Sequence, residues 1–380
     1  MVNQRMLGLG TARSVIRELF EYGKIRAAQV GAENVFDFSL GNPSVPCPQE
    51  VNDTAVRILR EQPEVIHCYT SAQGDQEARQ RFADSLNRRF GTCYTADQFY
   101  ITVGAAASLC CVFNGLTCPG DEFVVFAPYF PEYKVFIEGA GAKMVLIPPE
   151  LEGFHTKGVV VNTPNNPSGV VYSRETLERL AAILTEKSRA YGHPIYLISD
   201  EPYREIVFSG FQVPWIPQLY PDTIVCYSFS KSLSLPGERL GYVLVPASVT
   251  DSREVYAAVA GAGRSLGYVN APSLFQQVTS LCCDLTSDLA VYERNAKLLV
   301  PALREMGYHC VEPGGAFYLF PRSLEPDDMA FSERAKQFDL LLVPGSGFGA
   351  PGHVRIAYCV QTDMIQRALP KFKALADSYR

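Results

Sequence analysis

The chain has 380 residues, of which 47% are hydrophobic and 19% charged, proportions that are ordinary for a globular enzyme with a substantial core. The formal net charge of −6 and the lack of a long basic run argue against binding to nucleic acid or to an anionic membrane surface. The first ten residues have no apolar signal core and no stretch is long enough to span a bilayer, so a cytoplasmic protein is expected.

The eleven cysteines do not form the pattern of a disulfide framework or of a metal site. Their number is odd, and no CxxC pair of the zinc type occurs. Cys110-Cys111 and Cys282-Cys283 are adjacent pairs in apolar stretches that read as helical. We therefore expect most of the cysteines to be buried thiols in a reducing compartment, and no bound metal.

The N-terminal part of the chain predicts helices separated by one short strand. An apolar stripe at helical spacing predicts a helix over 11–30 that ends near Gly31. A short strand is expected at 36–40. Further helices are expected at 49–61 and 74–90.

From about residue 100, short apolar strands alternate with helices. Strands are expected at 100–103, 122–126, 143–147, 158–161, 195–198, 223–227 and 240–245, with the first helices at 105–116 and 131–139. This alternation is typical of a mostly parallel sheet covered by helices on both faces. The predicted fold class is therefore α/β.

After about residue 270 the pattern changes, which indicates a second, smaller unit. One long helix is expected over 272–308, broken near Gly307. A helix near 331–338, a strand at 339–343 and another at 354–357 follow before a last helix. We interpret this part as a smaller α+β domain.

Several polar residues follow the predicted strands directly. Gly104 follows one strand, Asn162 and Asn166 another, Asp200 a third and Lys231 a fourth. Ligands of an open parallel sheet bind beyond the carboxyl ends of its strands. We therefore expect these residues to converge on one site.

Lys231 is the most informative of them. It follows a strand that reads as buried, so its ammonium should lose water, its pKa should fall and its amine should become a nucleophile. Ser228, Ser230 and Arg239 lie nearby in the sequence and supply donors for a phosphate. A desolvated amine beside a phosphate cradle is what a Schiff base of pyridoxal 5′-phosphate (PLP) requires.

The run from Ser228 to Tyr242 resembles the lysine motif of class I/II aminotransferases, which are fold-type I PLP enzymes similar to aspartate aminotransferase. The segment 162–169 resembles their Asn-Pro-x-Asn-Pro-Thr-Gly motif, with Thr163 and Ser168 as departures, and 200–203 resembles Asp-x-x-Tyr. The matching motifs occur in the family's order over about 15–360. The resemblance implies a small domain built from both chain ends, so we expect segment 1–47 to join domain 271–380 around a PLP-binding domain at 48–270.

The same resemblance implies how the ring of PLP is held. Asp200 would keep the pyridine nitrogen protonated, which makes the ring an electron sink. Tyr203 and Asn166 would bond the phenolic oxygen. Phe130, in a segment that resembles Pro-x-Tyr-Pro-x-Tyr, would stack on the ring without the polar tip of tyrosine.

The phosphate is expected at the start of a helix, where free N–H groups and the helix dipole favour an anion. The residues implied for it are Gly104, Ala105, Ala106, Ser228, Ser230 and Arg239. Tyr69, in a segment that resembles Tyr-Thr-x-x-x-Gly, would reach the phosphate of the other subunit. The expected assembly is therefore a homodimer with shared active sites.

The substrate carboxylate is assigned to Arg355, an arginine in an otherwise apolar strand whose planar guanidinium suits bidentate binding. Gly41 and Asn166 would line the same place. For a dicarboxylate substrate, Arg264 is a candidate second cation, because its loop resembles the cross-subunit arginine loop of the aspartate enzymes at a slightly different spacing. Some bacterial aspartate enzymes have a lysine where this chain has Ala106, which leaves an aromatic or broad range of substrates open.

The function that the resemblance implies is transamination between an α-amino acid and a 2-keto acid. The amino group would pass by a ping-pong mechanism through a Lys231 Schiff base, with Lys231 as general acid and base. The aspartate/glutamate type is one open choice of substrate. A PLP-dependent β-lyase or another fold-type I enzyme on the same scaffold also remains open, as does a PLP-binding regulatory or non-catalytic protein.

Overall fold

The computed structural model describes residues 2–11, 15–146 and 155–380. Its helices are α1 Gln4–Thr11, α2 Val15–Val30, α3 Gln49–Glu61, α4 Gln76–Phe90, α5 Ala105–Leu116, α6 Glu132–Gly139, α7 Arg174–Tyr191, α8 Phe229–Ser232, α9 Ser252–Ser265, α10 Ser273–Leu281, α11 Ala290–Glu305, α12 Asp328–Lys336 and α13 Thr362–Asp377. Among the described residues, no helix combines the length and apolar character needed to cross a membrane.

The strands are β1 Phe36–Asp37, β2 Phe99–Thr102, β3 Glu122–Val125, β4 Lys143–Leu146, β5 Thr156–Asn162, β6 Tyr196–Asp200, β7 Thr223–Ser228, β8 Gly241–Leu244, β9 Tyr318–Leu319, β10 Leu340–Leu341, β11 Val343–Pro344 and β12 Val354–Ala357. Within the described chain, seven of them form the large sheet in the order β2-β8-β7-β6-β5-β3-β4. In this sheet β8 pairs antiparallel with both β2 and β7, and the other adjacent strands are parallel. The predicted α/β class with a mostly parallel sheet is confirmed.

Helices cover both faces of this sheet, because the buried side chains of each strand alternate in direction. Val160 and Ile224 pack with α5, α6 and α9 on one face. Val161 packs with α7 on the other face, where Val225 packs with α4 and α10. The carboxyl ends of the parallel strands meet at one edge, since Asn162 pairs with Asp200 in register.

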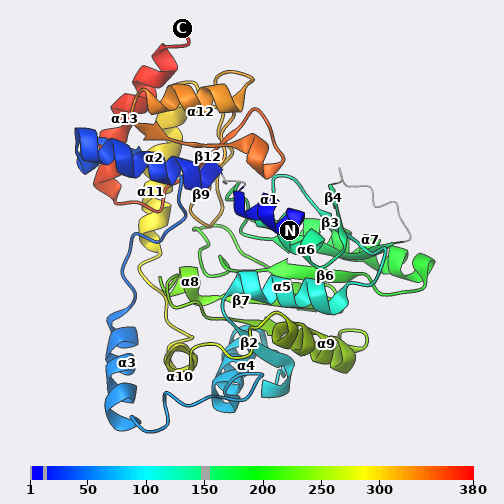
Figure 1. The fold of residues 1–380 in the computed structure, drawn as a ribbon. Helices are drawn as coiled ribbons and strands as arrows, with labels where there is room; N and C mark the ends of the chain where they lie inside the picture. Colours follow the sequence, from blue (N-terminus) through cyan, green and yellow to red (C-terminus); the bar gives the residue numbers. More distant parts are fainter. Residues whose placement is uncertain (1, 12–14, 147–154) are drawn as a thin grey trace.

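A second unit contains segments from both ends of the chain. β1 pairs in parallel with β10, and β9, β11 and β12 form an antiparallel sheet. Phe36 and Phe38 pack in one apolar cluster with Leu299 of α11 and Phe372 of α13. Figure 1 shows this unit, with α2, α11, α12 and α13, above the large sheet.

The expected long helix over 272–308 is wrong. The chain leaves the helix after Leu281 and forms α11 only from Ala290. The segment between α10 and α11 is held against α4, because the Asp284 carboxylate accepts hydrogen bonds of 2.5 Å from both Ser85 and Arg88 of that helix. Two other differences are smaller: the strand expected at 36–40 is limited to β1, and that at 339–343 is divided into β10 and β11.

The expectations for 11–30 and 143–147 are partly tested. Within them, α2 and β4 form as expected, while residues 12–14 and 147 lie outside the described part of the chain. All eleven cysteines are described and free, but only Cys111, Cys226, Cys282, Cys310 and Cys359 are buried. The expectation that most are buried is therefore wrong, and Cys282 and Cys283 lie beyond the end of α10.

Candidate active site

A cavity of about 290 Å³ lies beyond the carboxyl edge of the large sheet, next to β12. The predicted site residues that line it are Gly41, Ala105, Ala106, Phe130, Asn166, Asp200, Tyr203, Ser228, Ser230, Lys231, Arg239 and Arg355. These residues come from segments spread over more than 300 positions of the sequence. The convergence expected at the strand ends therefore exists in the folded chain.

Lys231 lies in α8, a single helical turn that begins where β7 ends. Its Nζ donates a hydrogen bond of 2.5 Å to the carbonyl oxygen of Gly41. Burial lowers the pKa of Lys231 to about 8, and the charges of Arg239 and Arg355 act in the same direction. A large fraction of this amine is therefore neutral, and nucleophilic, at mildly alkaline pH.

Asp200 is the last residue of β6 and is fully enclosed. The Tyr133 hydroxyl donates to its Oδ2 at 2.5 Å, and the Asn162 side chain donates to its backbone carbonyl at 2.8 Å. Within the described chain, Oδ1 has no hydrogen-bond partner. Burial raises the pKa of this carboxyl to about 7, although the bond from Tyr133 opposes the rise. Asp200 is thus a buried carboxyl whose Oδ2 has a donor, Tyr133, and whose Oδ1 has none within the described chain.

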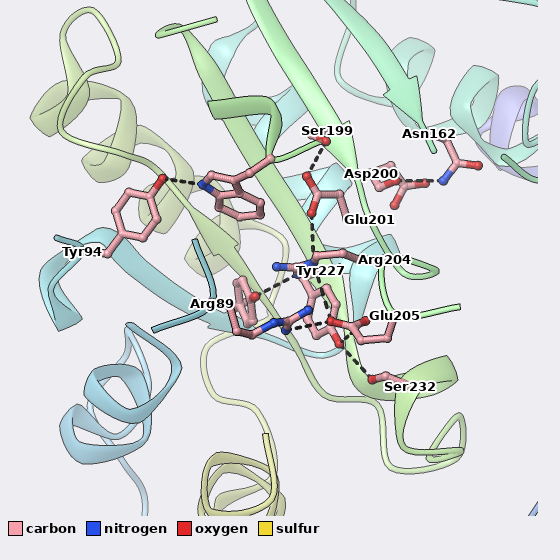
Figure 2. A network of polar contacts seen from close by, with 12 residues as sticks. Arg89, Tyr94, Asn162, Ser199, Asp200, Glu201, Arg204, Glu205, Tyr227 and Ser232 are labelled. Atoms are coloured by element: carbon pink, nitrogen blue, oxygen red, sulfur yellow. Dashed lines mark hydrogen bonds and ion pairs between the residues drawn. The ribbon is translucent and has the colours of Figure 1, made fainter. Parts of the chain in front are cut away.

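A buried charged network lies behind Asp200 (Figure 2). Arg204 pairs with Glu201 at 3.1 Å and with Glu205 at 3.7 Å. The Tyr227 hydroxyl donates to Glu205 at 2.9 Å and lies 2.9 Å from the Ser232 hydroxyl. The network therefore connects the turn after Asp200 to the helix that contains Lys231.

Groups that could bind an anion lie at the N-terminus of α5. Gly104 has a φ of 92°, and an ideal Cβ on it would lie 2.8 Å from Arg239 Nη2, so only glycine allows this close approach. The N-cap residue Gly104 makes no side-chain cap, so within the described chain the first N–H groups of α5 have no capping side chain. The hydroxyls of Ser228 and Ser230 lie 2.7 Å apart, and Arg239 donates to Ser230 at 3.4 Å. Together these groups suit a phosphate.

Arg355 lies on the opposite wall, within the otherwise apolar strand β12. It is 2% exposed, and it donates to Asn166 Oδ1 at 3.1 Å and to the Ser39 carbonyl at 2.5 Å. Neither partner is charged, although a buried guanidinium is stabilised best by a carboxylate. Arg355 therefore has the surroundings of a residue that binds an anion supplied from outside the chain.

Three predicted residues, Gly104, Tyr69 and Arg264, do not line the cavity, although Gly104 directly precedes the lining residue Ala105. Tyr69 is 95% exposed, and Arg264 is exposed near the end of α9. The loop of Tyr69 is joined to the segment that follows α9, because the Asn270 side chain donates to the Thr70 carbonyl at 3.1 Å and to the Ser71 carbonyl at 2.9 Å. Arg264 itself lies in the last turn of α9, so the expectation that it lies in a loop is wrong.

Sequence reasoning did not identify Tyr133, which contacts Asp200, nor five residues that line the cavity: Ile16, Leu109, Pro202, Pro236 and Tyr318. Tyr133 binds Asp200, Tyr318 lies with its hydroxyl oxygen 3.0 Å from that of Tyr203, and Ile16 of α2 lines the cavity. Tyr133 lies in the motif that contains Phe130, so its position was available as a signal. Tyr318 and Ile16 lie in ordinary apolar runs that indicate burial alone.

Comparison with known proteins places the chain among enzymes of one family. The model of the family "Aminotransferase class I and II" matches residues 33–372. The chain is 31% identical to the aspartate aminotransferase of Thermotoga maritima over 373 residues, 93% of this chain and 95% of that one. It is 30% identical to the aspartate/prephenate aminotransferase of Thermus thermophilus over 359 residues, 87% of this chain and 88% of that one.

Solved structures agree with this result. An amino transferase from Eubacterium rectale superposes with a TM-score of 0.97 and is 53% identical, over 100% of this chain and 99% of that one. The Thermus thermophilus aspartate aminotransferase with maleate superposes with a TM-score of 0.85 at 25% identity, over 99% of both chains.

Proposed function

Because this chain belongs to the class I and II aminotransferase family, we propose that its cavity holds PLP and that Lys231, Asp200, Asn166 and Arg355 carry out transamination there. The single observation that carries the proposal is the convergence of an amine with a lowered pKa, a buried carboxyl and an anion-binding helix start on one cavity. Each of these groups suits one part of PLP.

The fit to PLP rests first on Asp200. Its buried Oδ1 lacks a partner within the described chain, and a protonated pyridine nitrogen would supply that donor. Gly104, Ala105, Ala106, Ser228, Ser230 and Arg239 would hold the phosphate, Tyr203 and Asn166 would donate to the phenolic oxygen, and Phe130 would lie against the ring. When bound, PLP supplies a carbonyl carbon that accepts amino groups and a ring that withdraws electrons.

Lys231 then has two tasks that follow from its surroundings. Its neutral amine would be the nucleophile that holds the cofactor. When released from the cofactor, Nζ would be free to hold the proton that the substrate Cα loses. The Gly41 carbonyl keeps Nζ at a defined position for both tasks.

Arg355 would bind the α-carboxylate of the amino acid or 2-keto acid, assisted by Asn166 and by the backbone of Gly41. Its Nε has no partner within the described chain and could form the second bond of a bidentate pair. The relatives are named as aspartate and aspartate/prephenate enzymes, and a dicarboxylate would need a second cation. In this chain Arg264 could supply it only from a second subunit.

We infer a homodimer with shared active sites, because neither Tyr69 nor Arg264 lines the cavity of its own chain. Tyr69 is exposed on a loop that Asn270 joins to the segment after α9, and Arg264 is exposed in the last turn of α9. Nearby, Val65, Leu266 and Val269 are 61%, 40% and 45% exposed. A second copy would cover this apolar surface and would receive Tyr69 at its phosphate site. The free state of all eleven cysteines supports a location in the reducing cytoplasm.

The domain organisation is part of the proposal. Segment 1–47 and residues 271–380 would form the small domain, and 48–270 the PLP-binding domain. The shared apolar cluster of Phe36, Phe38 and α11 supports the first grouping. The placement of α10 against α3 and α4 favours moving the boundary beyond Leu281.

The test is the visible absorbance of purified protein before and after addition of glutamate. A yellow protein whose band is lost as the amino form of the cofactor appears would support PLP and the first half of transamination together. A yellow protein that ignores glutamate would keep the cofactor and favour another donor or lyase chemistry. A Lys231→Ala variant that transaminates at the wild-type rate, or a protein that takes up no PLP, would contradict the proposal.

A further inference from the structure

Tyr318 contacts residues on three sides of the cavity. Its hydroxyl oxygen lies 3.0 Å from that of Tyr203, and the guanidinium carbon of Arg355 lies 4.8 Å from the centroid of its ring. An ideal Cβ on Gly41 would lie only 1.9 Å from the Tyr318 hydroxyl. Tyr318 therefore meets the residues proposed for the phenolic oxygen, for the substrate carboxylate and for the bond to Lys231.

The position of Tyr318 is set by regular structure. It lies in β9, where its backbone pairs in register with Ala357 of β12, two residues after Arg355. It is 3% exposed, and its ring meets that of Tyr203 edge-on at 82° with centroids 5.6 Å apart. The strand pair thus holds Tyr318 and Arg355 in a constant relation.

An anionic oxygen in the cavity would fix which of the two hydroxyls, Tyr318 or Tyr203, donates the hydrogen bond between them. A hydroxyl has one proton to donate. Burial raises the pKa of Tyr318 to about 12, and it raises that of Tyr203 above its ordinary value, so both groups are protonated at neutral pH. If Tyr203 donates into the cavity, the bond between the two oxygens requires that Tyr318 donates to Tyr203. Such a chain of donors strengthens the last bond.

We propose that Tyr318 is a positioning residue for the proposed PLP site: its hydroxyl directs the Tyr203 proton into the cavity, and its ring holds the Arg355 guanidinium. The inference rests on the proposed function, because it assigns Tyr203 to an anionic oxygen of the cofactor. The two contacts use different parts of one side chain, so two substitutions can separate them.

Tyr318→Phe removes the hydroxyl and keeps the ring. Without the Tyr318 hydroxyl, Tyr203 would be a weaker donor to the phenolic oxygen and would stabilise the negative charge on that oxygen less. The midpoint of the pH-dependent change in visible absorbance should therefore rise by about half a unit to one unit. The KM for the amino donor should change less than about twofold, since the ring remains. Tyr318→Leu removes the ring as well, and we expect it to raise KM about fivefold or more.

Tyr308→Phe is the matched control. Tyr308 is 2% exposed in the C-terminal unit, and its hydroxyl donates to the Phe372 carbonyl at 3.2 Å, away from the cavity. This variant should lose stability without a shift in the absorbance midpoint. A double-mutant cycle adds a second check, because Tyr318→Phe should have no effect on the midpoint in a Tyr203→Phe background.

The outcomes distinguish the inference from the proposed function. A wild-type protein that takes up no PLP would overturn both. A wild-type protein whose absorbance titrates, with Tyr318→Phe at the same midpoint as Tyr308→Phe, would overturn the role of Tyr318 alone. If Tyr318→Phe does not fold, two other variants keep the inference testable. An unchanged KM in Tyr318→Leu would overturn the role of the ring. An absorbance midpoint in Tyr203→Phe equal to that of the wild type would overturn the role of the hydroxyl pair.

Discussion

The Lys231 Nζ lies 2.5 Å from the carbonyl oxygen of Gly41, a residue 190 positions earlier in the chain. This bond joins the helix after β7 to the segment that follows β1. The carbonyl satisfies one donor of a buried ammonium without supplying a counter-charge, so the lowered pKa persists.

The lowered pKa of Lys231 predicts how the stability of cofactor-free protein depends on pH. The ordinary pKa is 10.5 and the folded value about 8, so between these values the unfolded chain binds a proton that the folded chain does not. The free energy of unfolding should therefore rise with pH across this window, by about 3 kcal/mol relative to Lys231→Met. Urea unfolding of both proteins at several pH values measures the difference.

Lys231→Met is the reference because it keeps a long side chain without a charge. Other groups titrate equally in both proteins, so their contribution cancels. A stability difference that stays constant from pH 8 to pH 10.5 would show that Lys231 keeps its ordinary pKa.

Arg355→Lys should weaken substrate binding without affecting the cofactor. A lysine keeps the charge but cannot form a planar bidentate pair with a carboxylate. We expect KM for the amino donor to rise about 10- to 100-fold, which corresponds to a loss of about 1.4 to 3 kcal/mol, with an unchanged visible spectrum. Steady-state kinetics provide the measurement, and Arg174→Lys, at an exposed pair with Glu178, is the control. An unchanged KM in Arg355→Lys would assign the carboxylate to another residue.

Arg204→Met should destabilise the fold strongly. Its removal leaves the buried carboxylate of Glu201 without its paired cation, while Glu205 keeps Arg89 at 3.0 Å. It also removes a guanidinium 4.2 Å from the Tyr227 ring centroid. Breaking a buried pair in this way costs about 3 to 5 kcal/mol. Arg174→Met, at a surface pair more than half exposed on both sides, should cost less than about 1 kcal/mol.

Denaturant unfolding at pH 7 compares the two variants. A second substitution, Glu201→Gln, should restore part of the stability lost in Arg204→Met, because it removes an unpaired charge. Equal losses in the buried and the exposed variant would show that the network contributes no more than a surface pair.

Shared active sites predict complementation between two inactive variants. Lys231→Ala disables the site of its own chain, while Tyr69→Ala would disable the site of its partner. In a hybrid dimer, both changes would then fall in one site and leave the other intact. Mixed subunits should recover about a quarter of the wild-type activity after random pairing. Co-refolding followed by an activity assay tests this, and no recovery would place Tyr69 in the site of its own chain.

Much of the fold could be predicted because strands and helices leave local periodic patterns. The expected helices at 49–61 and 105–116 match α3 and α5 in full, and the strands of the large sheet lie within a few residues of their expected positions. The break between α10 and α11 could not be predicted, because it depends on bonds from Asp284 to a helix about 200 residues earlier. Nothing in the local apolar pattern records such a partner.

The same division applies to the candidate site. The residues at the strand ends, including Asp200 and Lys231, could be predicted, because strand ends and motif spacing are local properties. The partners of the site residues could be identified only in the folded chain: Tyr133 for Asp200, and Tyr318 for Tyr203. Bonds between residues 67 and 115 positions apart depend on how the sheet and the C-terminal unit pack, and no spacing in the sequence encodes that distance.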